Sequence, residues 1–148
     1  MISEKRSFTF RRYVTCSAFG HSAWEILHSP LYRGWMPSLI SETPLLLARC
    51  VIIDALLALA ALSLAVWFTG NSGWPDAGYW TAGGRAIALG VVLAVLAEWL
   101  NVYLLGTWNY SPPMPVVPFL NVGVSPLLQW VLVPGLSLWW ARPKGLPD

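Results

Sequence analysis

Charge is scarce in this chain, and its scarcity excludes an ordinary soluble domain. Of the 148 residues, 11% are charged and 56% are hydrophobic, whereas about 25% charged residues is usual in soluble proteins. The net charge is only +2, and the basic residues form no patch interleaved with aromatic residues, as a nucleic-acid-binding surface would. The composition therefore predicts a protein that has lipid as its solvent and does not bind nucleic acid.

Cysteine and the common cofactor motifs are scarce as well. Both cysteines, Cys16 and Cys50, lie in apolar segments, where a thiol behaves as a small hydrophobe. The chain has no CxxC, HExxH, phosphate-loop or nucleophile-elbow motif, so we predict no metal site and leave the cofactor open. His21 and His28 lie on one helix and cannot clamp haem within a single chain, although a homodimer or Met114 could supply the second ligand.

Four stretches of the chain approach the roughly 20 apolar residues that a transmembrane helix needs. They are residues 13–29, 44–68, 84–105 and 122–141. Because long runs of Leu, Ala and Val satisfy their backbone in lipid only as helices, we predict an all-α membrane bundle of four transmembrane helices, a single domain over residues 1–148. The first stretch contains ionisable side chains, so an interfacial amphipathic helix is the alternative there, and whether it fully spans stays open.

The distribution of basic residues predicts the orientation. Six of the nine Lys and Arg residues precede the first stretch or follow the last: Lys5, Arg6, Arg11, Arg12, Arg142 and Lys144. Because basic residues accumulate on the cytoplasmic side, both termini should be cytoplasmic, in a cell inner membrane. An even number of spans is what this orientation requires.

Several polar side chains lie inside the predicted helices, where an ionisable group costs about 3 kcal/mol or more and is a functional candidate by default. They are His21, Glu25, Arg49, Asp54, Glu98, Asn101 and Gln129. With both termini inside, the alternating directions of the helices place all of them in the outer half of the membrane. We therefore expect one polar pocket between the four helices, roofed by the loop of residues 108–118.

The acids in this pocket are the catalytic candidates. Glu25, Asp54 and Glu98 outnumber the one nearby arginine, so at least one of them should hold a proton, as a general acid must. His21 lies four residues before Glu25 on the same helical face and is the fourth candidate. Arg49 points away from Asp54 on its own helix, so we expect it to meet Glu25 or Glu98.

Six side chains are candidates for contact with a ligand: Arg49, Asn101, Trp108, Tyr110, Gln129 and Trp130. Trp108 and Tyr110 also lie where an aromatic belt is expected, and membrane anchoring is the simpler explanation for them. For Asn101, Gln129 and Ser125 we favour a structural role as interhelical hydrogen bonds, worth about 1 kcal/mol each.

Four segments together resemble a family of small uncharacterised bacterial inner-membrane proteins with four helices: GHSAWEILHSPLY, RCVIIDALLAL, EWLNVYLLGTWNYSPPMP and GVSPLLQWVLVPG. The resemblance covers most of the chain. It implies four helices and the outer-half polar cluster, and it implies no activity. The chain departs from this family at Arg49, where a histidine is expected before the cysteine, which weakens a metal site further.

Two fainter likenesses concern the arrangement of acids and aromatic residues. His21 with Glu25, and Gln129-Trp130 before a proline, are similar in arrangement to sterol-isomerase-like membrane proteins. Glu98, followed by aromatic residues and prolines, resembles membrane carotenoid cyclases and hydratases. Both likenesses imply a buried acid that acts on a hydrocarbon in an apolar, aromatic-lined pocket.

Two functional hypotheses of different classes follow, and whether the chain is an enzyme stays open. In the first, the polar pocket binds a membrane lipid, an isoprenoid or another apolar small molecule and acts on it by acid/base chemistry. In the second, the chain is a non-catalytic small subunit or assembly factor of a membrane complex, with a membrane-protein partner or a second copy of itself. A transporter is less favoured, because no inverted repeat is visible.

Overall fold

The computed structural model describes residues 2–33, 43–70 and 72–143 of the chain. Its elements, in chain order, are α1 (Ile2–His28), η1 (Ser29–Leu31), α3 (Thr43–Thr69), α4 (Tyr79–Glu98), η2 (Trp99–Leu104), β1 (Val116–Val117), β2 (Val122–Gly123) and α5 (Val124–Ala141). The prediction of a mainly helical chain with four long helices is confirmed. A short antiparallel hairpin, β1 with β2, interrupts the helical pattern before α5.

Three segments within these helices are long and apolar enough to cross a membrane: Ala48–Thr69 in α3, Tyr79–Leu104 in α4 and η2, and Val124–Ala141 in α5. The shortest has 18 residues, which at about 1.5 Å per residue gives about 27 Å, close to the roughly 30 Å of a hydrocarbon core. The predicted membrane character of the chain is therefore confirmed for these three. With 27 residues α1 is also long enough, but its average hydropathy is lower because it carries many polar side chains.

Some helix boundaries differ from the predicted ones. α1 begins at Ile2 instead of near residue 13, because hydropathy marks only the apolar part of a helix and misses its charged first turns. A long-range contact holds these turns: Lys5 Nζ lies 3.0 Å from each carboxylate oxygen of Asp76. α4 begins more than a turn earlier than predicted, and α5 begins at Val124 because the two preceding residues form β2.

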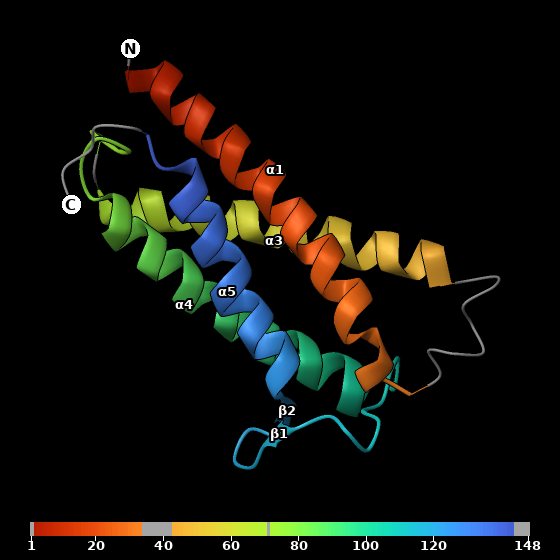
Figure 1. Cartoon of the computed structure of the whole chain (residues 1–148). Coiled ribbons are helices and arrows are strands. Elements are labelled where there is room, and N and C mark those ends of the chain that lie inside the picture. Colours follow the sequence, from red (N-terminus) through yellow and green to blue (C-terminus); the bar gives the residue numbers. More distant parts are fainter. Residues whose placement is uncertain (1, 34–42, 71, 144–148) are drawn as a thin grey trace.

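Each of the four long helices packs against two others. α1 lies against α3 and α5, and α4 lies against the same two helices. The start of α1 and the end of α5 lie at one end of the molecule, and the β1–β2 hairpin lies toward the other (Figure 1). The contact of α4 with α5 is close: a Cβ atom added to Gly90 would lie 2.4 Å from Cε3 of Trp130. Glycine at this position is therefore required by the neighbouring indole ring.

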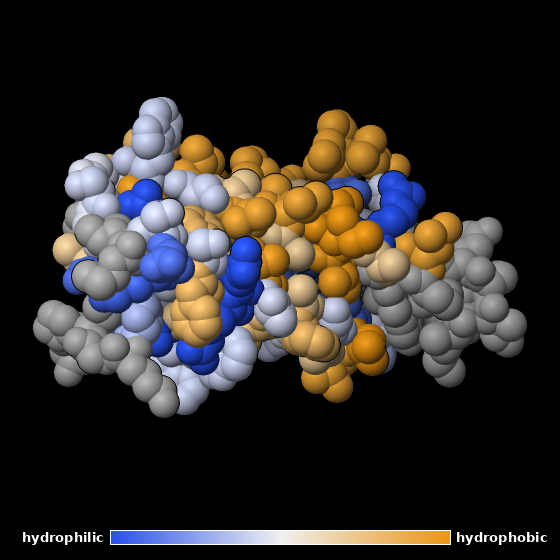
Figure 2. Space-filling model, turned by 90° about the horizontal axis from the view of Figure 1, so that it is seen from above, coloured by the Kyte–Doolittle hydropathy of each residue, from blue (hydrophilic) through white to orange (hydrophobic). Residues whose placement is uncertain are grey.

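The exterior of the helices is largely apolar. Large hydrophobic side chains are exposed on α3, α4 and α5, among them Ile52, Trp67, Leu96 and Leu136. Figure 2 shows hydrophobic residues over the middle of the molecule and hydrophilic residues gathered toward one end. A continuous exposed apolar surface of this kind is typical of a lipid-facing belt.

The two faces of α1 differ sharply in character. Four side chains at successive four-residue steps are at most 1% exposed, and all four are polar or carry a hydroxyl group: Thr9, Tyr13, Ser17 and His21. The opposite face exposes Phe19, Ile26 and Leu27 at 74%, 60% and 78%. The low average hydropathy of α1 therefore has two sources: polar side chains that are buried against α3 and α5, and exposed polar residues in its first half, among them Glu4, Ser7 and Arg11. The outward face is apolar in the second half of the helix.

Candidate functional site

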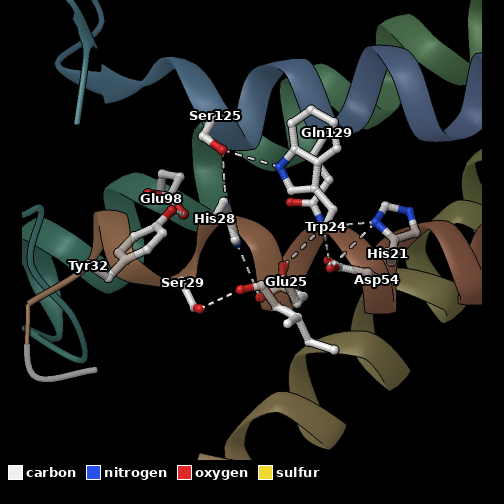
Figure 3. Close-up of polar contacts among 11 residues, drawn as sticks. His21, Trp24, Glu25, His28, Ser29, Tyr32, Asp54, Glu98, Ser125 and Gln129 are labelled. Carbon is white, nitrogen blue, oxygen red and sulfur yellow. Dashed lines mark hydrogen bonds and ion pairs between the residues drawn. The ribbon is translucent and has the colours of Figure 1, made fainter. Parts of the chain in front are cut away.

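A cluster of polar side chains lies between α1, α3 and α5. Its members, called the Glu25 cluster below, are His21, Glu25, His28, Asp54, Ser125 and Gln129 (Figure 3). The three residues from α1 are spaced by four and then three positions, which places them on one helical face. The side chains of Glu25 and Asp54 are 14% and 16% exposed, and His21 is fully buried.

The Gln129 side chain is the centre of the cluster. Its Nε2 atom lies 3.0 Å from His21 Nδ1, donates to Glu25 Oε1 at 3.0 Å and donates to Asp54 Oδ2 at 3.3 Å. An amide nitrogen carries two protons, so it cannot serve three acceptors at once. The carboxyl groups of Glu25 and Asp54 therefore lie close to the same amide nitrogen, at 3.0 and 3.3 Å. Neighbouring buried carboxyl groups repel each other when both are ionised, which favours a state with one proton on the pair.

A second set of hydrogen bonds runs in one direction toward Glu25. Trp24 Nε1 donates to Ser125 Oγ at 3.2 Å, and Ser125 Oγ lies 3.0 Å from His28 Nδ1. His28 Nε2 lies 3.3 Å from Glu25 Oε2. The serine hydroxyl, having accepted from the indole, is free to donate to Nδ1, which leaves the imidazole proton on Nε2 facing the carboxylate. Both oxygens of Glu25 are thus held, one by Gln129 and one by His28.

Glu98 forms a separate cluster under the loop that follows η2. Tyr32 Oη donates to Glu98 Oε1 at 3.3 Å, and Tyr110 Oη donates to Glu98 Oε2 at 2.6 Å. The backbone amide of Gly123 donates to Tyr110 Oη at 3.0 Å. Burial, with the neighbouring Glu98 carboxylate, raises the pKa of both tyrosines above the ordinary tyrosine value. Both phenols therefore stay protonated and keep donating to Glu98.

The two clusters adjoin each other at Tyr32. Its ring packs edge-on against His28 with the ring centroids 5.3 Å apart, and against Trp108 with the centroids 6.2 Å apart. The backbones of Tyr32 and Tyr110 form an isolated antiparallel bridge, which brings the end of α1 to the loop. Among the described residues, no direct hydrogen bond joins Glu98 to the Glu25 cluster. The sequence predicts one pocket at this place, and the structure has two adjoining clusters.

Two of the predicted polar site residues lie outside both clusters. Arg49 is exposed and forms no ion pair with Glu25 or Glu98, so the predicted pairing is wrong. The reason is helical phase: five residues separate Arg49 from Asp54, which turns the guanidinium about 140° away from the buried face. Asn101 Nδ2 donates to the carbonyl oxygen of Ala97 in its own helix at 2.8 Å, so this side chain serves its own backbone.

The aromatic candidates take supporting positions. The ring of Trp130 packs against His21 with the centroids 5.2 Å apart, and Trp108 lies against Tyr32. Within the described part of the chain, Trp108 Nε1 is buried without a hydrogen-bond partner. The site residue that sequence reasoning missed is Tyr32, which nothing in the local pattern marks. Ser125 has the interhelical role expected for it, since its hydroxyl contacts Trp24 and His28 of α1.

The Glu25 cluster is open to the exterior through a shallow groove between α1 and α3. The groove has a volume of about 380 Å³ and is lined by Ser22, Glu25, Ile26, Ala48, Val51 and Ile52. Its walls are apolar except for Ser22 and Glu25. Glu25 is therefore the one ionisable side chain among the described residues that both lines the groove and belongs to the buried cluster.

Among residues 2–33, 43–70 and 72–143, no three His, Cys, Asp or Glu side chains converge closely enough to hold a metal ion. The chain was also compared with protein-family models, with curated proteins and with solved structures, and none of them matches it.

Proposed function

We propose that α1 spans the membrane together with α3, α4 and α5, which makes the chain a four-helix bundle of a cell inner membrane with both termini cytoplasmic. The apolar outward face of the second half of α1, with Phe19, Ile26 and Leu27 exposed, supports this arrangement. A polar buried face is tolerated in a spanning helix when its groups pair with neighbouring helices. Lys5 and Arg6 at the start of α1 favour the cytoplasmic side for that end.

We further propose that the groove between α1 and α3 binds an apolar or amphipathic molecule, a lipid or an isoprenoid, and that Glu25 exchanges a proton with it. The observation that carries this proposal is the dual position of Glu25, on the groove wall and in the buried cluster. An acyl or isoprenoid chain matches the apolar walls at Ile26, Val51 and Ile52. Among the described residues that line the groove, only Glu25 has an ionisable side chain. Its carboxyl group is therefore the one that can transfer a proton to the bound molecule.

The cluster equips Glu25 for proton transfer in either direction. The Glu25 and Asp54 pair holds one proton. When Glu25 delivers this proton to the bound molecule, both carboxyl groups are left ionised, and their repulsion favours the return of a proton from the molecule to the pair. His28 and Gln129 keep the carboxyl group in place during both steps. Migration of a carbon–carbon double bond fits this site without a further reactant. One proton is added at the first alkene carbon, and another is removed from the carbon attached to the second alkene carbon, so no net proton is consumed.

Glu98 has a positioning role in this proposal. Its two oxygens hold Tyr32 and Tyr110, and these residues close the end of the molecule next to the Glu25 cluster. Loss of Glu98 should therefore loosen the loop and alter access of water, while the groove itself stays lined by the same residues. Exclusion of water strengthens the electrostatic interactions inside a site and limits side reactions.

Native mass spectrometry of the protein, extracted gently from its own membrane, tests the proposal. The wild-type protein should retain a stoichiometric lipid or isoprenoid, and Glu25→Gln should retain less of it or retain it unaltered. Asp76→Asn is the matched control, because it also changes a carboxyl group to an amide. Asp76 pairs with Lys5, which lies near the start of α1 and far from the Glu25 cluster. A stoichiometric protein partner together with an empty groove would reject the proposal and favour the subunit or assembly-factor hypothesis.

A further inference from the structure

The hairpin of residues 115–123, called the apolar hairpin below, has the sequence PVVPFLNVG. Val116 pairs with Gly123 and Val117 pairs with Val122. The side chain of Phe119 at its turn is 97% exposed, and Val116 and Leu120 are exposed as well. An apolar turn that projects from a protein is a contact site for lipid or for another protein, because water solvates it poorly.

Two aromatic side chains of η2 donate hydrogen bonds to carbonyl groups of this hairpin. Trp99 Nε1 donates to the carbonyl oxygen of Leu120 at 2.7 Å, and Tyr103 Oη donates to that of Asn121 at 2.6 Å. The amides of Leu120 and Asn121 both donate to the carbonyl oxygen of Val117, at 3.2 and 2.8 Å. The two prolines of the hairpin contribute no N–H group. A turn whose backbone groups are hydrogen-bonded can move from water into lipid, whereas a turn with unpaired groups would lose its hydrogen bonds to water on doing so.

The apolar hairpin is continuous with the exposed apolar surface of η2 and of Leu105, the residue that follows it. Leu100, Leu104 and Leu105 are 45%, 77% and 62% exposed, and the span that crosses the membrane ends at Leu104. Trp99 and Tyr103, which hold the hairpin, are also partly exposed at this end of the span. Tryptophan and tyrosine at the end of a spanning helix mark the depth of the lipid headgroups.

We infer that the apolar hairpin inserts into the bilayer interface, with Phe119 and Leu120 among the first carbons of the acyl chains of the nearest leaflet. The occupant of this surface is lipid, because the surface continues the lipid-facing belt and the backbone groups of Leu120 and Asn121 are already paired. The insertion also connects the loop that covers the Glu98 cluster to the membrane. Gly123 at the base of the hairpin donates to Tyr110, which in turn donates to Glu98.

Depth-dependent fluorescence quenching tests this inference on the full-length protein. A Phe119→Cys variant in a Cys16→Ala/Cys50→Ala background is labelled with an environment-sensitive fluorophore and reconstituted into phosphatidylcholine vesicles. The label should emit at short wavelength. A spin label near the headgroup end of the acyl chain should quench it more strongly than one near the chain terminus. Because Phe119 is 97% exposed, the substitution leaves packing unchanged.

Asn109→Cys is the matched control, because Asn109 is an exposed polar residue of the same loop, and its label should be quenched by aqueous iodide instead. A label at position 119 that behaves like this control would overturn the inference. A label shielded from iodide and also unquenched by either lipid spin label would overturn it too, since another protein surface would then cover the hairpin.

Removal of the two donors gives a second, independent readout. Trp99→Phe with Tyr103→Phe keeps two aromatic rings but leaves the carbonyl groups of Leu120 and Asn121 without partners. In the Phe119→Cys background, the label should move toward water, with longer-wavelength emission and greater quenching by iodide. Unchanged emission would show that backbone pairing does not hold the hairpin in lipid and would overturn that part of the argument.

Discussion

Replacement of Gln129 by leucine removes the amide that connects α5 to α1 and α3. Leucine has nearly the same volume, so the packing stays filled and the change isolates the hydrogen bonds. In the wild-type protein the amide nitrogen contacts His21, Glu25 and Asp54 at 3.0, 3.0 and 3.3 Å. Because it can donate only two protons, two hydrogen bonds are lost, and buried acceptors are left without a donor.

The expected loss in the free energy of unfolding is about 1–3 kcal/mol. Hydrogen bonds to charged groups in soluble proteins contribute about 1.5–3 kcal/mol each, which would give up to about 6 kcal/mol for two. Measured interhelical hydrogen bonds in membranes average about 0.6 kcal/mol and reach about 1.7 kcal/mol, because helices that separate in lipid find other partners. The membrane values apply here, since two of the three helices that form the cluster, α3 and α5, contain segments apolar enough to span a bilayer.

Reversible unfolding in mixed micelles, followed by tryptophan fluorescence, measures this loss. Asn101→Leu is the matched control, because the Asn101 amide donates only to its own helix and its replacement should cost less than Gln129→Leu. In a Glu25→Gln background the cost of Gln129→Leu should fall by at least about 0.5 kcal/mol, since residues that share a hydrogen bond are not additive. Equal costs for Gln129→Leu and Asn101→Leu, with full additivity, would refute the reasoning.

Three further outcomes are expected. Gly90→Ala should destabilise the protein by about 1–3 kcal/mol in the same unfolding assay, because the new Cβ atom would lie 2.4 Å from the Trp130 ring. Ser17→Ala should be neutral or stabilising, because it removes a buried hydroxyl that has no partner among the described residues, whereas Ser125→Ala should cost about 1–3 kcal/mol. Ultraviolet titration should show that Tyr110 does not ionise at pH about 10, because its pKa in the folded protein is raised. The hydrogen bond from Tyr110 to Glu98 is therefore present at and below this pH. It is lost only as the pH rises through the raised pKa of the folded state.

Each of these outcomes has a control within the chain. Gly84→Ala has no atom within 4 Å of its new Cβ, so it should cost nothing and can stabilise α4 by up to about 1 kcal/mol. Equal effects at the two glycines would contradict the packing argument. A loss of stability in Ser17→Ala as large as that in Ser125→Ala would contradict the account of the buried hydroxyls. A Tyr110→Phe variant that loses tyrosinate absorbance at pH about 10 would show that this phenol titrates normally.

Much of the fold follows from hydropathy, and part of the site follows from helical spacing. Runs of Leu, Ala and Val predict the three apolar spans, since no other structure satisfies the backbone in lipid. The spacing of His21, Glu25 and His28 predicts one buried face, and the structure brings this face to Asp54 and Gln129. The charged first turns of α1 escape prediction, because their contact with Asp76 joins residues that are far apart in the sequence.

The arrangement around Glu98 was beyond reach from the sequence alone. Tyr32 and Tyr110 meet through a backbone bridge between two loops, and no local periodicity encodes such a contact. The apolar hairpin was also missed, because a short run containing two prolines has neither the length of a span nor the alternation of an ordinary strand. The charge of Arg49 predicts a position beside the acids of the pocket, whereas its helical phase decides where it lies.

The central claim is that Glu25 meets an apolar molecule from the groove while it shares a proton with Asp54. Reaction with dicyclohexylcarbodiimide in native membranes, followed by peptide mass spectrometry, tests this directly, because this apolar reagent enters from lipid and attacks carboxyl groups that carry a proton. The account predicts modification at Glu25, slowed when the groove is occupied, with Asp76 unmodified. A protein that is unmodified at Glu25, or modified only at other carboxyl groups, would contradict it.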